Sequence, residues 1–344
     1  MSGERVHRTR HSIEVAASAG ALYALLADGV RRPLYCPSVL HVERLDFDGA
    51  RERLRVWEDA GGSIRSSFVA REQYPHERRI AFQELRPAAP VESMGGEWTV
   101  EETAAGGSVV TVRHAFTVLG EHGEHGDDAD EVARVTSRGA RAELESLRRV
   151  AESRAGVDDL VLAFEESVWV NGPGELVYDF LYRAADWPGL LPHVRRLRLT
   201  EPSAGLQLLD YAVALPDGAQ RETGAVRLCF PHAGRIVYKE TAPAAPVAAH
   251  TGEWSVLPGE HGVRVVAQHR VLLDADAVRA LPGSGVYALG PASRAPSRAV
   301  LARHCLRESI GRTSLATLAL AKRHAESAVR SLPRRPAVPA AGAS

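Results

Sequence analysis

The sequence is poor in the residues and patterns that mark several large classes of protein. It has only 3 cysteines in 344 residues, Cys36, Cys229 and Cys305, which are far apart and odd in number. This usage is typical of a reducing compartment and argues against a disulfide framework or a paired-cysteine metal site. We therefore expect a cytoplasmic protein in which the three cysteines are small, buried hydrophobic residues.

An excess of charge of one sign is also missing. The sequence has 42 Lys and Arg against 43 Asp and Glu, a net charge of −1 at pH 7. A nucleic-acid binder would carry a basic excess, so no nucleic-acid partner is expected. No apolar run reaches the roughly 18 residues of a membrane span, and the first residues lack the apolar core of a secretory signal. We expect no membrane association.

Short motifs of familiar enzyme classes are absent as well. The sequence has no GxSxG, HExxH, GxGxxG or phosphate-binding Gly-Lys-Ser/Thr pattern. His122, His125, Asp127 and Asp128 have metal-ligand side chains, but their Gly-rich surroundings favour a solvated loop. The sequence therefore predicts neither a bound metal nor a cofactor.

The sequence does contain one segment that occurs twice, and we refer to it as the repeated passage. RIAFQELRPAAPVESMGGEWTV occupies residues 79–100, and RIVYKETAPAAPVAAHTGEWSV follows at 235–256, a constant offset of 156 with 12 of 22 positions identical. The preceding segments 11–42 and 166–197 align at offset 155. Such an offset is one domain long, whereas solenoid repeats are about 20–50 residues long. We infer that a whole domain was duplicated.

The duplication predicts two domains, at residues 5–155 and 158–330. The Pro/Ala-rich tail at 333–344 is expected to be disordered.

Each half follows the same order of elements: a strand, a short helix, a run of strands and a long helix. In the first half we expect strands at 12–15, 41–47, 51–57, 63–71, 79–85, 95–102 and 108–119 and helices at 19–28 and 127–153. In the second we expect strands at 167–170, 195–201, 206–215, 223–230, 235–241, 251–257 and 263–273, helices at 174–186 and 296–332, and a loop at 274–297.

A curved antiparallel sheet can bury one face by wrapping around the long helix, and the space left between them becomes an internal cavity. The pattern thus predicts an α+β protein of two tandem helix-grip domains.

The repeated passage supplies the first candidate site residues. Alternation along a strand places Trp98 and Trp254 on the face opposite the preceding glutamate, where each is either plain core or a flat wall for a planar ligand. Arg71 and Arg227 recur at offset 156 in the middle of a strand pattern. An arginine is costly in a dry core, so each either points to solvent or lines a wet cavity. There it can hold a carbonyl or enolate oxygen.

The duplicated unit, with SMGGEWTV, TGEWSV and WPGLLPHV, resembles the di-domain aromatase/cyclases of bacterial type II polyketide synthases over roughly residues 5–330. These proteins belong to the START-like (SRPBCC) superfamily. The resemblance implies a cofactor-free enzyme that directs regiospecific first-ring (C7–C12) aldol cyclisation, dehydrative aromatisation, or both, on a poly-β-ketone bound to an acyl carrier protein. The implied partners are that carrier protein, the minimal polyketide synthase and, for a reduced substrate, a ketoreductase.

The resemblance also implies which residues act. Arg71 and Arg227 match the family's inward-facing sheet arginine, and His193 and Tyr35 are further catalytic candidates. The substrate-binding candidates are Trp98, Trp254, Trp187, Ser67, Ser93 and Tyr211. Basic residues near the presumed cavity mouth are candidates for docking an acidic carrier protein, with plain solvated surface as the alternative: Arg31, Arg32, Arg195 and Arg196.

The two halves are not identical at these positions. The second has Trp187-Pro188 where the first has Arg32-Pro33, which suggests two inequivalent pockets. An alternative of another class is a helix-grip carrier that binds a lipid or aromatic ligand without chemistry. A carrier would have a more uniformly apolar cavity without an inward arginine, so the cavity lining discriminates between the two.

Overall fold

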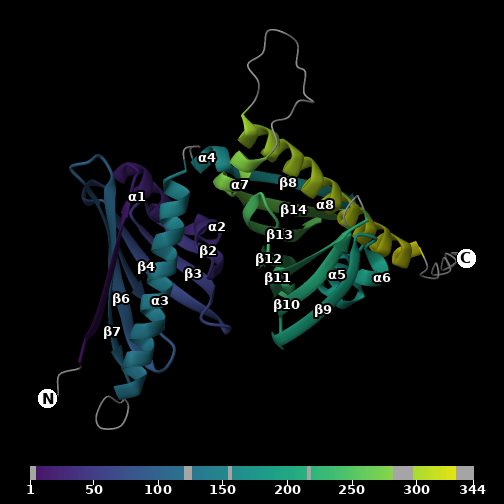
Figure 1. Cartoon of the computed structure of the whole chain (residues 1–344). Helices are drawn as coiled ribbons and strands as arrows, with labels where there is room; N and C mark the ends of the chain where they lie inside the picture. Colours follow the sequence, from purple (N-terminus) through teal and green to yellow (C-terminus); the bar gives the residue numbers. More distant parts are fainter. Residues whose placement is uncertain (1–4, 120–125, 154–156, 215–217, 282–296, 331–344) are drawn as a thin grey trace, which may run out of the picture. The chain divides into compact units, whose positions relative to one another are not determined.

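The computed structural model describes residues 5–119, 126–153, 157–214, 218–281 and 297–330. Within them the polypeptide forms two compact units, one built mainly on a first antiparallel sheet and the other mainly on a second (Figure 1). His122, His125 and the tail at 333–344 lie outside the described residues.

The first sheet has seven strands in the order β1-β7-β6-β5-β4-β3-β2. Their bounds are β1 His7–Val15, β2 Val39–Phe47, β3 Arg51–Asp59, β4 Ile64–Tyr74, β5 Arg79–Glu84, β6 Val91–Glu102 and β7 Ser108–Val118. All seven expected strands form, several of them longer than the sequence pattern indicated. Consecutive strands pair as antiparallel neighbours from β2 to β7, which is the topology that short turns between alternating segments favour.

Three helices cover the first sheet. The helix α1, Ala19–Ala27, begins at the N-cap Ser18, whose side chain accepts a hydrogen bond from the backbone N–H of Ala21. A 3-10 turn and the short α2, Arg32–Tyr35, follow. The long α3, Gly126–Ala151, lies against β1 and β7 and also contacts α1 and α2 (Figure 1). Sheet and long helix therefore form the helix-grip arrangement that the sequence predicted.

The second sheet repeats this topology in the order β8-β14-β13-β12-β11-β10-β9. Its strands are β8 Val161–Val170, β9 Val194–Ser203, β10 Leu206–Ala214, β11 Gln220–Phe230, β12 Arg235–Glu240, β13 Val247–Gly259 and β14 Gly262–Leu273. The helices are α4 Val157–Leu160, α5 Gly174–Tyr182, α6 Trp187–Leu190, α7 Ala275–Ala280 and α8 Arg298–Arg330. Leu318, Ala321 and Ala325 of α8 are fully buried at helical spacing in the core of this sheet.

Two expectations were wrong. Part of the loop expected at 274–297 is the helix α7, because the Asp274 side chain caps it by accepting hydrogen bonds from the backbone N–H groups of Asp276 and Ala277. Cys305, expected to be buried, is exposed on α8, whereas Cys36 and Cys229 are buried.

The repeated passage has one backbone conformation in both copies. Ala89-Pro90 and Ala245-Pro246 are both cis peptide bonds. Alternation holds as well: Trp98 is 9% exposed on the inner face, and the Glu97 carboxylate pairs with Arg113 at 2.9 Å on the other face. None of the helices in the described ranges is long and apolar enough to span a membrane.

Candidate functional site

A cavity of about 430 Å³ lies between the first sheet and its helices. Four of the catalytic and substrate-binding candidates line it, namely Tyr35, Ser67, Arg71 and Trp98. They come from α2, β4 and β6, so the fold gathers side chains that are up to 63 positions apart. In the part of the chain that the structure describes, no group of three His, Cys, Asp or Glu residues is placed to hold a metal ion.

One row of residues crosses the sheet at the position of the arginine. Strand register places Glu52 opposite Arg71, Arg71 opposite Phe82, Phe82 opposite Gly96 and Gly96 opposite His114. Residues directly opposite each other on neighbouring strands point to the same face. The row therefore presents an acid, a cation, an aromatic ring and an imidazole on the inner face of the sheet.

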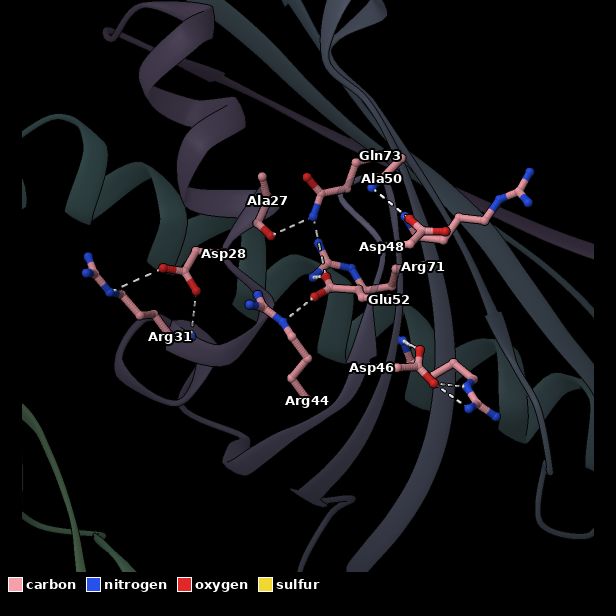
Figure 2. A network of polar contacts seen from close by, with 12 residues as sticks. Ala27, Asp28, Arg31, Arg44, Asp46, Asp48, Ala50, Glu52, Arg71 and Gln73 are labelled. Carbon is pink, nitrogen blue, oxygen red and sulfur yellow. Dashed lines mark hydrogen bonds and ion pairs between the residues drawn. The ribbon is translucent and has the colours of Figure 1, made fainter.

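Arg71 is buried, with 7% of its side chain exposed, and its charge is matched by a carboxylate. Its Nη1 donates to Glu52 Oε1 at 2.8 Å and its Nη2 donates to the Leu26 carbonyl. Figure 2 shows Arg44 reaching the other oxygen of Glu52, where its Nε donates to Oε2 at 2.9 Å. Burial lowers the pKa of Arg71 to about 10, so the guanidinium stays protonated at neutral pH. The sequence did not predict this pairing with Glu52.

Gly96 lets two rings approach each other across the row. A Cβ atom at this position would lie 1.9 Å from the Arg113 carbonyl oxygen and 2.8 Å from Phe82 Cζ. The Phe82 and His114 rings meet edge-on at 5.4 Å between centroids. The strand glycine is thus required by close packing of neighbouring groups.

His114 is a cavity residue that the sequence reasoning missed. Its Nδ1 is buried and has no hydrogen-bond partner among the described residues. Burial lowers its pKa to about 4, so at neutral pH the ring is an uncharged imidazole able to accept a proton. Its alternation with Val110 and Val112 on β7, which are fully buried, was the signal that could have placed it on the inner face.

A second polar cluster lies in the wall of the same cavity. Arg32 donates from Nη2 to Glu143 Oε1 at 2.9 Å, and the Cys36 thiol donates to the same oxygen at 3.1 Å. Burial would lower the pKa of Arg32, but the Glu143 carboxylate raises it above its ordinary value. Burial also raises the pKa of the Glu58 carboxyl in this wall. Arg32 is therefore held inside the cavity, unlike Arg31, whose side chain is 48% exposed.

Ser93 does not share the cavity with the other candidates. Its hydroxyl lies 2.9 Å from the Thr117 hydroxyl on β7, and the neighbouring Met94 lines the cavity. A register shift between Val91 and Ser93 lies at this end of β6.

The charged lining of the cavity also differs from the uniformly apolar wall expected of a lipid or aromatic carrier.

In the second half the structure brings Arg227 together with two of the tryptophans. The arginine is 1% exposed, and its guanidinium carbon lies 4.9 Å from the Trp187 ring and 5.7 Å from the Trp254 ring. The two indoles meet edge-on at 6.0 Å. Arg227 Nη2 donates to the Leu181 carbonyl, as Arg71 does to Leu26 in the first half.

The remaining second-half candidates are Tyr211 and His193. Tyr211 is partly buried and packs against the same core. Burial lowers the pKa of Arg227, an effect that Cys229, Tyr178 and Tyr211 oppose. His193 precedes β9 and is half-buried, and burial lowers its pKa. No contact of His193 with Arg227 is seen among the described residues.

The sequence is similar to those of known polyketide cyclases and dehydratases. A family model described as polyketide cyclase / dehydrase and lipid transport matches residues 6–152. The granaticin polyketide synthase bifunctional cyclase/dehydratase of Streptomyces violaceoruber is 34% identical over 330 residues, covering 94% of this chain and 95% of that protein. The actinorhodin counterpart of Streptomyces coelicolor is 31% identical over 338 residues, covering 95% and 98%.

A solved structure extends the likeness to the whole fold. The di-domain ARO/CYC BexL from the BE-7585A biosynthetic pathway matches with a TM-score of 0.77 and 33% identity, covering 93% of this chain and 99% of that one. Both halves are thus shared with an enzyme of the same architecture. The chain belongs to the di-domain polyketide aromatase/cyclases, the bifunctional cyclase/dehydratases of type II polyketide synthase pathways.

Proposed function

We propose that this cyclase/dehydratase closes the first ring of a poly-β-ketone between C7 and C12, with the chain delivered by an acyl carrier protein. The observation that carries the proposal is the first-half cavity, because it joins a buried cation, a neutral imidazole and hydroxyl groups in one space. The chemistry needs no cofactor, since a methylene between two ketones is already acidic. Holding the flexible chain in one reactive conformer supplies much of the acceleration.

Arg71 stabilises the oxygen on which charge develops. When the methylene loses its proton, the electron pair spreads onto the adjacent carbonyl as an enolate. Attack of this carbon on the second ketone forms the new bond and turns that carbonyl oxygen into an alkoxide. A fixed guanidinium beside either oxygen lowers the energy of the charged species, because it needs no reorganisation during the reaction. Trp98 supplies a flat wall of the cavity.

Uncharged side chains of the cavity transfer the protons. The neutral imidazole of His114 accepts the methylene proton, and a hydroxyl of Tyr35 or Ser67 returns one to the alkoxide. Loss of the resulting hydroxyl group together with a neighbouring ring proton releases water, and enolisation of the remaining ring ketones, by transfer of ring protons from carbon to oxygen, leaves the aromatic ring. At neutral pH His114 is uncharged, which is the state in which an imidazole can accept a proton.

The test is reconstitution of the full chain with a minimal type II synthase and its carrier protein, with and without a C9 ketoreductase. Products are identified by mass spectrometry. We expect one aromatic first ring in place of spontaneous shunt products, and loss of that ring in Tyr35→Phe, His114→Gln and Arg71→Ala, each checked for folding by circular dichroism. Substitution of the exposed Cys305 by Ala serves as the control. An unchanged product spectrum in all three variants would remove these roles.

We propose further that the two halves are domains of residues 5–155 and 158–330 and that the protein works in the cytoplasm.

We also propose that exposed basic residues dock the acyl carrier protein. Arg31, Arg195 and Arg196 are available for this, although Arg31 pairs with Asp28 and Arg196 with Glu222. Charge reversal to Glu at these sites should lower product yield most at low salt, because exposed charges are screened. Yield independent of both charge and salt would contradict docking.

A further inference from the structure

The same arginine has a different partner in each half. In the first sheet Glu52 of β3 lies opposite Arg71 of β4. In the second, Gln207 of β10 lies opposite Arg227 of β11. Both arginines are otherwise held alike, since each donates from Nη2 to a leucine carbonyl, Leu26 or Leu181. The halves thus share one frame and differ in the residue directly opposite the cation, an acid in the first half and a neutral amide in the second.

In the first half that charge neutralises the arginine. The Glu52 side chain is 0% exposed and bonds Arg71 through one oxygen and Arg44 through the other. Figure 2 shows the carboxylate between the two guanidinium groups, with Gln73 beside it. With this carboxylate in contact, Arg71 attracts an anion from the cavity less strongly than a guanidinium without a carboxylate partner would.

In the second half no carboxylate among the described residues contacts the arginine in this way, and the charge of Arg227 reaches Glu201 only at longer range. Arg227 Nε and Nη1 are buried and have no hydrogen-bond partner among the described residues. Gln207 turns its Nε2 to the Tyr182 carbonyl at 3.3 Å and to Glu201 at 3.4 Å. Glu201 itself is exposed and accepts from the Tyr182 hydroxyl at 2.5 Å. Three N–H donors on these two nitrogens of a buried cation are therefore left for an acceptor from outside the protein.

We propose that Glu52 and Gln207 set the ligand preference of the two halves, so that Arg227 binds the anionic oxygen of a planar conjugated molecule, while Arg71 binds a carbonyl that is neutral in the bound substrate and gains charge only during the reaction. This rests on the proposed function, in which such molecules are the enolates and phenolates formed from a poly-β-ketone. The second half then holds the more acidic species of the reaction sequence, the cyclised, aromatising ring.

The surroundings of Arg227 favour a flat ligand. Trp187 and Trp254 both lie within 6 Å of its guanidinium carbon, at 4.9 and 5.7 Å. Their rings hold the guanidinium in place and offer aromatic faces, to which planar molecules bind well. Trp254 and Tyr211 are only partly buried, so this side of the group is not sealed by the core. The first half has Arg32 at the position of Trp187.

The proposal is tested by calorimetric titration of the full chain with 1-naphthoate, a planar anion, and 1-naphthamide, its neutral analogue. Wild-type protein should bind naphthoate at least tenfold more tightly. Gln207→Glu should reduce the affinity for naphthoate tenfold or more and leave that for naphthamide within twofold. The same variant should raise the melting temperature without ligand, because the new carboxylate pairs with Arg227. A merely structural role for Gln207 predicts neither the selectivity change nor the rise.

The matched control is Gln220→Glu, which adds the same charge at an exposed position of the same strand as Arg227 and should change neither affinity by more than twofold. Equal binding of the two probes by wild-type protein would overturn the proposal, as would unfolding of Gln207→Glu. The proposed function fails separately: naphthoate selectivity that depends on Gln207, with no effect of the protein on synthase products, would leave the anion site and remove the cyclase role proposed above. Altered synthase products without naphthoate selectivity would support the cyclase role and remove the anion site.

Discussion

Replacing Glu52 by Gln should destabilise the first unit strongly, because it removes the only charge that the buried Arg71 contacts directly among the described residues. Removing one partner of a buried ion pair costs about 3–5 kcal/mol. The amide oxygen of Gln can still accept one hydrogen bond, which restores about 1 kcal/mol. Arg44, with 37% of its side chain exposed, adds little since water can solvate it. We therefore expect a loss of about 2–4 kcal/mol.

The measurement is urea denaturation followed by circular dichroism, with thermal melting alongside. For a unit of this size each kcal/mol lowers the melting temperature by roughly 2–4 °C, so a fall of roughly 9 °C is expected. The matched control is Glu72→Gln on β4. Its carboxylate pairs with Arg51 at 2.9 Å, but the two side chains are 33% and 70% exposed. This variant should lose no more than about 0.5 kcal/mol.

A double-mutant cycle separates the pair from its surroundings. Glu52→Leu with Arg71→Met should cost less than the sum of the two single changes by about 2–3 kcal/mol, because neither charge is then left buried alone. If Glu52→Gln proved no more harmful than Glu72→Gln, or if the cycle showed no coupling, the account of Arg71 as a neutralised cation would be refuted.

Two further predictions concern the same row of the sheet. Gly96→Ala should lower the free energy of unfolding in urea by about 3 kcal/mol, because its Cβ would lie 1.9 Å from a backbone oxygen. In the control Gly95→Ala the new Cβ meets chiefly the flexible Gln83 side chain, at 2.3 Å, and the loss should be about 1 kcal/mol or less. Equal losses in the two variants would contradict the packing argument. For His114 the folded pKa of about 4 lies below the ordinary 6.5, so the unfolded chain binds the extra proton and stability is lost as pH falls from about 6.5 to 4. This contribution reaches about 3 kcal/mol, and the pH dependence of the urea midpoint should flatten in His114→Gln; identical pH profiles would show that the histidine is not buried neutral.

The sequence predicted the fold well because its evidence is local. Alternation located all fourteen strands, and helical spacing located α3 and α8 to within a few residues. Cys305 was placed wrongly, since composition says that cysteines are usually buried but cannot say which face of α8 points to the core. The helix α7 was missed because its Asp274 cap is a short local signal within a segment read as a loop.

The site was only partly accessible from the sequence. The repeat marked Arg71, Arg227, Trp98 and Trp254, since a residue kept in both copies stands out against its neighbours. It did not mark Glu52, whose counterpart Gln207 is a different residue, and His114 was missed although His269 stands at offset 155 in the matching strand. Their importance comes from strand register, which places them in one row with Arg71.

By itself, then, the sequence determined the duplication, the order of elements and the identity of the two sheet arginines, because these depend on periodicity and on comparing the chain with itself. Tertiary structure alone decided what each arginine faces. Glu52 pairs directly with Arg71, whereas Gln207 stands opposite Arg227, which no carboxylate among the described residues contacts; both pairings join residues about 20 positions apart. The physical reason is that burial and electrostatic pairing depend on distances between strands, which one-dimensional spacing does not encode.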